Sequence, residues 1–158
     1  MKKKNTLSTV LLAFASLFRF GGREEVCNAY AESPHPHGNI GKTAEAAFPQ
    51  RNLLAIKGTA AQSIALGTAT DEPLGTVADT PSIGDRANVR HLGASTGTTT
   101  MVGSKALAEN VRVYTTAGGK ITDTAVNGSW LVGKTTEACS GDGVDVEVVP
   151  CFPVEQSV

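Results

Sequence analysis

The chain of 158 residues has few aromatic side chains, few cysteines and no excess of basic charge. Aromatic residues make up 5% of the sequence, so a core has to be built mainly from aliphatic side chains. Three cysteines are too few, and odd in number, for a disulfide scaffold. With a formal net charge of -1, the chain lacks the basic excess that phosphate neutralisation requires, so we do not expect the folded part to bind nucleic acid.

Cys27, Cys139 and Cys151 are predicted to be free thiols. If residues 140–143 form a hairpin turn, Cys139 lies beside the turn and Cys151 lies further along the next strand. About seven residues at ~3.3 Å each separate the two cysteines by roughly 20 Å. A disulfide needs Cα atoms about 4.4–6.8 Å apart, so this pair should not be bridged.

Residues 1–50 differ from the rest of the chain. Residues 1–51 carry seven basic and four acidic side chains, and the remainder carries seven and eleven, which gives +3 and -4. A basic start is followed by an apolar segment at residues 7–18, too short to span a bilayer. Three interpretations remain open: a retained arm that docks on a partner, a secretion signal cleaved after Ala31, and a mistaken start site.

The segment at residues 32–50 is predicted to be a linker. Its two prolines between residues 33 and 38 favour extended backbone, and Gly41 is expected to loosen the residues after it. We therefore divide the chain into an N-terminal arm and linker at residues 1–50 and a β-rich domain at residues 51–158.

The domain is predicted to be all-β, a small β-barrel or β-sandwich. Turn signals recur about every 8–12 residues, and no segment has a helical period. In residues 144–148 valines alternate with Asp145 and Glu147, which predicts a strand with one buried and one wet face. We expect strands at residues 53–57, 63–66, 74–78, 87–92, 98–102, 111–115, 120–122, 130–135 and 144–149.

Residues 128–135 match the phosphate-loop pattern letter for letter. A phosphate loop has to follow a buried strand and open a helix, so that backbone amides converge on the phosphate. Here the preceding residues make a poor buried strand, and the segment itself resembles a strand. We interpret the match as accidental and expect Lys134 to have no role in nucleotide binding.

For the other candidate sites, a structural role explains the residues better than a functional one. His35 and His37 have no further metal ligand nearby, and His91 has no partner that marks it as a general base. An acidic group at Asp142, Asp145 and Glu147 lacks the spacing of a known calcium loop, which favours an exposed acidic edge. We therefore predict no catalytic residue, no metal and no cofactor, and interpret Trp130 as a core or subunit-contact anchor.

A set of short motifs resembles the head-decoration, or capsid cement, proteins of tailed phages. Their order and spacing over about residues 52–151 carry the resemblance. The motifs are Leu53-Leu54-Ala55-Ile56-Lys57-Gly58, Ala69-Thr70-Asp71-Glu72-Pro73-Leu74-Gly75-Thr76, Gly84-Asp85 with Val89 and Leu92-Gly93, Val113-Tyr114-Thr115 with Gly118-Gly119-Lys120, and Gly133 through Gly141-Asp142 to residues 146–151.

The resemblance implies a β-barrel or β-tulip domain, often a homotrimer, on the outer surface of the capsid. Such a protein is a structural component of the virion, assembled in the host cytoplasm, that holds neighbouring major capsid subunits together. The family carries no catalytic residues. We expect no nucleic-acid partner and no membrane partner. We expect edge strands to pair with neighbouring chains and the capsid contacts to be Phe14, Phe18, Phe20, Tyr30 and Phe48. The alternative is an exported β-sandwich adhesion or binding module with a cleaved signal peptide.

Overall fold

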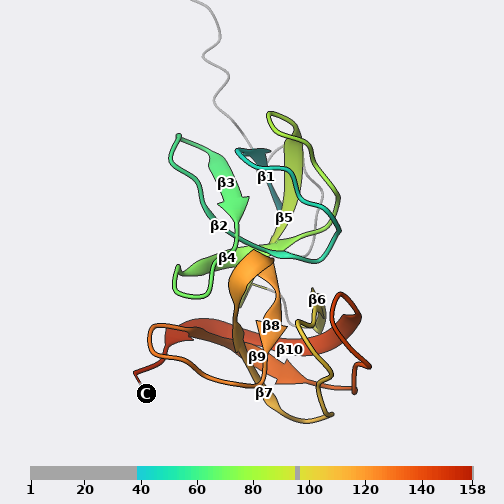
Figure 1. Cartoon of the computed structure of the whole chain (residues 1–158). Coiled ribbons are helices and arrows are strands. Elements are labelled where there is room, and N and C mark those ends of the chain that lie inside the picture. The colour runs from blue at the N-terminus through green and yellow to red at the C-terminus, as the bar shows by residue number, and fades with distance from the viewer. Residues whose placement is uncertain (1–38, 95–96, 158) are drawn as a thin grey trace, which may run out of the picture. The chain divides into compact units, whose positions relative to one another are not determined.

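The computed structural model describes residues 39–94 and 97–157, which form two β-sheets and contain no α-helix (Figure 1). All of the described residues belong to one compact unit. The all-β prediction is therefore confirmed. Each predicted strand is present and begins within one residue of its expected start, and the last strand continues to Glu155.

The first sheet is a closed five-stranded barrel with the strand order β1-β3-β2-β4-β5. Its strands are β1 (Asn39–Ala44), β2 (Leu54–Lys57), β3 (Ser63–Leu66), β4 (Pro73–Val77) and β5 (Arg86–His91). Strand β1 closes the barrel, since it pairs parallel to β3 on one side and antiparallel to β5 on the other. The buried core of the barrel consists of Ala44, Phe48, Leu53, Ala55, Ile64, Val77, Ala87, Val89 and Val102.

The linker prediction is wrong for residues 39–44, because they form β1. Gly41 suggested a loose chain, but it lies in β1, where the Arg86 side chain covers it. A Cβ added at Gly41 would lie 2.4 Å from Nε of Arg86, so this glycine allows a close approach. The partners of β1 are distant in sequence, and for that reason the local pattern gave no sign of the strand.

The second sheet is curled and has the strand order β6-β10-β9-β7-β8. Its elements are β6 (Thr99–Val102), β7 (Arg112–Thr115), a short 3-10 turn η1 (Ala117–Gly119), β8 (Ile121–Thr122), β9 (Trp130–Thr135) and β10 (Asp145–Glu155). The N–H of Ser104 donates to the carbonyl oxygen of Ile121 at 2.9 Å, which draws the two edge strands together. The core inside the curl consists of Leu54, Leu92, Met101, Leu107, Val113, Ile121, Val132, Cys139, Val146 and Val148.

Leu53 and Leu54 join the two cores. Leu53 packs in the barrel, whereas Leu54 packs in the core of the second sheet, because adjacent residues of an extended chain point to opposite sides. In the opposite direction, Val102 belongs to β6 of the second sheet but packs in the barrel core. Cβ atoms added at Gly67 and Gly119 would lie 2.7 and 2.6 Å from the carbonyl oxygen of Leu54, so both glycines allow the chain to close over this junction.

Phe48 is buried and is not the exposed anchor that was predicted, since only 2% of the residue is exposed. It lies in the barrel core, where its N–H donates to the carbonyl oxygen of Pro81 at 3.0 Å. The other four predicted contact residues, Phe14, Phe18, Phe20 and Tyr30, lie outside the described residues.

The carboxylate of Glu45 holds the loop between β2 and β3. The backbone N–H groups of Thr59 and Ala60 donate to it at 2.9 and 2.7 Å, and the hydroxyls of Thr59 and Ser63 also donate to it. These bonds, foremost those from the Ala60 N–H and the Ser63 hydroxyl, lower the pKa of Glu45 from 4.5 to about 2. The charged form of Glu45 is therefore the one that the fold stabilises.

We expect Glu45→Gln to lower the free energy of unfolding near neutral pH and to make this free energy less dependent on pH in the acid range. Because the pKa of Glu45 is depressed in the folded state, its contribution is complete above about pH 4.5 and is lost as the pH falls toward about 2. The measurement is the urea midpoint of both proteins across this range. Glu109→Gln, in an exposed loop, is the control. A gap between Glu45→Gln and the unaltered chain that stays constant down to about pH 2 would contradict the prediction.

Phe48→Ala should destabilise the domain by about 3–5 kcal/mol, because it leaves a cavity in a closed barrel core. Equilibrium unfolding in urea measures the loss. The matched control is Phe152→Ala, which truncates a phenylalanine that is 73% exposed and should change stability by no more than about 0.5 kcal/mol. Equal losses in the two variants would show that Phe48 is not a core residue.

Candidate interaction surface

Large hydrophobic side chains are exposed at six of the described positions, and half of these positions lie on β10. They are Ile83, Val126, Val144, Val149, Phe152 and Val154. Phe152 and Ile83 are the most exposed, at 73% and 72%. Ile83 lies in the tight turn between β4 and β5, where the N–H of Asp85 donates to the carbonyl oxygen of Ser82 at 3.1 Å. Phe152 lies within a strand, so its exposure needs a separate explanation.

Strand β10 changes its environment after Val148. Up to that residue it pairs with β6 on one side, and exposed and buried side chains alternate. The pairing with β6 ends there, because β6 begins at Thr99 opposite Val148, and within residues 39–94 and 97–157 the rest of β10 pairs only with β9. The pairing with β9 also shifts, because Pro150 lies opposite Gly133 and Val154 lies opposite Leu131. This β-bulge places extra residues on β10 and turns Phe152 outward.

Prolines occupy the open edge of β10. The carbonyl oxygen of Glu147 points toward β9, where it accepts from the N–H of Thr136. The backbone polar groups of successive residues point to alternate sides of a strand, so the backbone nitrogen of Pro150 points to the open side. Beyond the bulge, the N–H of Gln156 donates to Ser129, again on the β9 side, which places Pro153 on the open side. Proline has no N–H to donate, so this edge is poorly suited to pairing with another strand.

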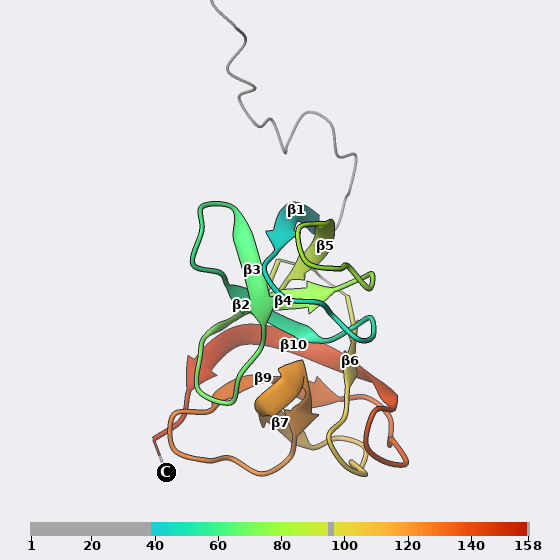
Figure 2. The same cartoon turned by 45° about the horizontal axis from the view of Figure 1, so that its top comes forward.

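Phe152 forms one wall of an open groove between β10 and the barrel. The opposite wall comes from β2, β4 and the end of β5, including Ile56, Leu74 and Leu92. Figure 2 shows β10 crossing the molecule between the barrel strands and β9. The ring lies over Gly93, where an added Cβ would be 2.6 Å from its Cδ1 atom. A glycine with φ of +75° is thus required beneath the exposed aromatic ring.

The rim of this groove is polar and carries more negative than positive charge. Asp71, Glu72, Lys57 and His91 line it together with the apolar residues. Burial, followed by the charge of Lys42, lowers the pKa of His91, which favours the neutral imidazole. Two carboxylates therefore face one lysine at this site.

The sequence-based residues of chemical interest do not come together in the described part of the chain. Cys139 and Cys151 are free thiols, which confirms the prediction for these two. Burial raises the pKa of Cys151, which disfavours its reactive thiolate. Cys27, His35 and His37 lie outside the described residues.

The phosphate-loop match at residues 128–135 forms β9 for most of its length. Gly133 lies in a sheet: a Cβ there would be 2.4 Å from the carbonyl oxygen of Val149. Lys134 projects from the exposed face of the strand. The strand-like interpretation is therefore confirmed, and the segment does not have the loop-to-helix geometry of a phosphate site.

The three acidic residues near the last turn have separate partners. Asp142 forms an ion pair with Lys120 at 2.6 Å, Asp145 accepts from Nδ2 of Asn52 at 3.0 Å, and Glu147 accepts from the Thr98 hydroxyl. Within residues 39–94 and 97–157 there is no group of three His, Cys, Asp or Glu side chains that would hold a metal ion.

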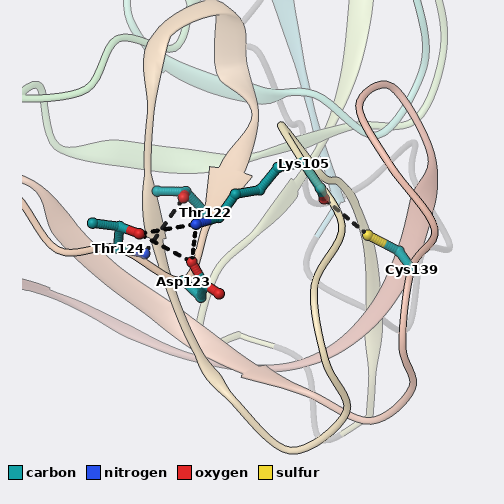
Figure 3. Close-up of polar contacts among 5 residues, drawn as sticks. All are labelled: Lys105, Thr122, Asp123, Thr124 and Cys139. Carbon is teal, nitrogen blue, oxygen red and sulfur yellow. Dashed lines mark hydrogen bonds and ion pairs between the residues drawn. The ribbon is translucent and has the colours of Figure 1, made fainter.

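A polar cluster joins the loop after β6, the loop after β8 and the loop before β10 (Figure 3). Nζ of Lys105 lies 2.5 Å from Oδ1 of Asp123 and donates to the Thr124 hydroxyl at 3.0 Å. The lysine lowers the pKa of Asp123, and Sγ of Cys139 donates to the carbonyl oxygen of Lys105 at 3.4 Å. The ion pair is partly exposed, so we interpret the cluster as a loop tie of modest strength.

Trp130 is half-buried at the start of β9, outside both buried cores. Its indole Nε1–H donates to the carbonyl oxygen of Thr70 at 3.0 Å, across from the second sheet to the loop that precedes β4. The residue therefore fastens that loop, which carries the acidic rim of the groove.

A solved structure with a similar fold is the head fiber gp8.5 N base in bacteriophage phi29. The TM-score is 0.58 at 14% sequence identity, and the match covers 75% of this chain and 98% of that chain. At this identity the similarity establishes a shared fold. No protein family and no curated protein matches the sequence. Among the described residues no helix is long and apolar enough to cross a membrane.

Sequence reasoning missed the groove and its aromatic wall. One signal was present, because the regular alternation of residues 144–148 is followed directly by two prolines that flank Cys151 and Phe152. A proline cannot lie within a central ladder, so the pattern indicates a bulge or an open edge. The opposite wall comes from strands far away in the sequence.

Replacing both edge prolines, Pro150→Val with Pro153→Val, should make the domain aggregate. Each change restores an N–H donor on the open side of an apolar strand, which permits edge-to-edge pairing. Light scattering over time at increasing protein concentration measures the effect, with circular dichroism to verify the fold. Pro49→Val, at an exposed loop position, should not increase scattering. Equal scattering from all three proteins would contradict this role of the prolines.

Proposed function

We propose that the protein is a structural component of a bacteriophage virion that binds the outer surface of the capsid. The observation that carries the proposal is the shared fold with the base of a phage head fibre, over 98% of that chain. The motifs that resemble capsid cement proteins point independently to the same location. The proposed partner is the major capsid protein, and the proposed assembly is a homotrimer.

The described residues offer a surface suited to binding. Several of their charged side chains are engaged in ion pairs and loop contacts that hold the fold together. What the surface offers is an exposed aromatic ring beside a groove, which is the usual form of a protein contact site.

Such a protein stabilises a capsid by mass action. It binds only the assembled shell, so each bound copy shifts the equilibrium away from disassembly. Several contacts made by one oligomer raise the effective concentration of each, so individually weak contacts suffice. Reinforcement of contacts between neighbouring capsid subunits follows if a single oligomer spans their junction.

The test is binding of the purified chain to expanded capsids of the phage that encodes it, assembled without the chain. We expect saturable co-sedimentation and a higher temperature of capsid disruption in its presence. Cryo-electron microscopy of the complex would place the extra density. No co-sedimentation, and no change in capsid stability, would refute the proposal.

The contribution of the arm is tested separately by deleting residues 1–38. The deletion has to stop there, because β1 begins at Asn39 and is required to close the barrel. If Phe14, Phe18, Phe20 and Tyr30 contact the capsid, the truncated chain remains folded and its occupancy falls. Mass spectrometry of the mature N-terminus distinguishes the alternative, since cleavage after Ala31 favours an exported binding module.

A further inference from the structure

The Phe152 groove has features of a binding site that the other exposed hydrophobic positions lack. Ile83 is as exposed as Phe152, but it lies on a tight turn whose neighbours, Ser82, Gly84 and Asp85, are also exposed. Phe152 is joined by apolar side chains from other strands, among them Ile56 and Leu74. A contiguous apolar wall can bury a partner side chain completely, as binding hot spots do.

Three local departures from regular structure display this ring. A bulge interrupts β10 between Pro150 and Val154, Gly93 takes a left-handed φ of +75°, and the pairing with β6 ends at Val148. Gly93 matters most directly, because a Cβ there would lie 2.6 Å from Cδ1 of the ring, and the ring would have to move from this position. An exposed phenylalanine adds little to folding, and a contact with a partner would account for its display.

The prolines on the open edge determine how an occupant would bind. Pro150 and Pro153 remove backbone donors from the open side of β10, and Pro153 lines the groove, so a partner gains little from adding a strand there. Affinity then has to come from side chains inserted between Phe152 and the barrel wall.

The charge of the rim limits the chemistry of that occupant. Asp71 and Glu72 lie on one loop beside the apolar wall, and Lys57 is the one lysine or arginine among the described residues that line the groove. Asp71 is held in position by the Thr68 hydroxyl, which donates to Oδ2 at 2.8 Å. Complementary charge favours association, whereas a like charge at this rim would oppose it.

We propose that this groove is the capsid-docking surface, and that it receives a segment of a capsid subunit with an apolar side chain next to a lysine or arginine. The apolar side chain packs against Phe152 and the barrel wall, and the basic group faces Asp71 and Glu72. This inference rests on the proposed function and adds to it the contact surface and the chemistry of the partner.

Capsid co-sedimentation with matched variants of the full chain tests the groove. Phe152→Ser should weaken binding at least about tenfold, as expected for a central hot spot. Ile83→Ser removes an equally exposed side chain elsewhere and should bind as the unaltered chain does. Glu72→Lys should also weaken binding, and binding of this variant should depend less on salt. Circular dichroism and urea midpoints verify that each variant is folded.

The outcomes separate this inference from the proposed function. Normal binding by Phe152→Ser overturns the groove assignment and leaves capsid binding intact. Normal or tighter binding by Glu72→Lys overturns the basic partner group. A change in the sedimentation coefficient of Phe152→Ser in the absence of capsids would show that a second copy occupies the groove, which also overturns the inference. Failure of the unaltered chain to bind capsids removes the proposed function and this inference together.

Discussion

The junction at Leu53 and Leu54 is the constraint on which the rest of the structure depends. One step along an extended chain places one leucine in the barrel and the next in the core of the second sheet. Each half alone has a small core with hardly any aromatic side chains, and a small domain with little buried apolar surface is marginally stable. Leu54 comes from the barrel and packs in the core of the second sheet, whereas Val102 comes from the second sheet and packs in the barrel core. Each half therefore completes the core of the other. Gly67 and Gly119 permit the close packing of backbone that this exchange needs.

The end of β10 lies beside the barrel, where Phe152 and Pro153 line the groove. Through Val148, β10 is a central strand with a neighbour on each side. Beyond that point it has one neighbour, two prolines and a bulge, and its side chains no longer alternate between core and solvent. One strand therefore serves two purposes: its first half stabilises the second sheet, and its second half presents an aromatic ring without offering a pairing edge.

Capsid binding, the role proposed for this protein, places few chemical demands on a sequence. Binding needs a stable frame and a few well-placed side chains, whereas the backbone fold can persist as sequences diverge. The fold of this chain is similar to that of a head fibre base although the two sequences are only 14% identical. The phosphate-loop match shows the converse, since eight residues agree with a motif while the backbone forms a strand. Function on this fold has to be inferred from the surface that the strands form together.

The sequence alone determined the all-β class, nearly all strand positions, the turns and the free state of Cys139 and Cys151. These features depend on local properties, namely the period of two in strands and the backbone freedom of glycine. The tertiary structure decided the remainder. Strand β1 was missed because pairing with β3 and β5 defines it, and Phe48 was assigned to the surface because its burial depends on barrel closure. The groove was missed for the same reason: Phe152 meets Ile56 and Leu74 only after β10 packs beside the barrel, and such contacts between distant segments leave no periodic trace in the chain.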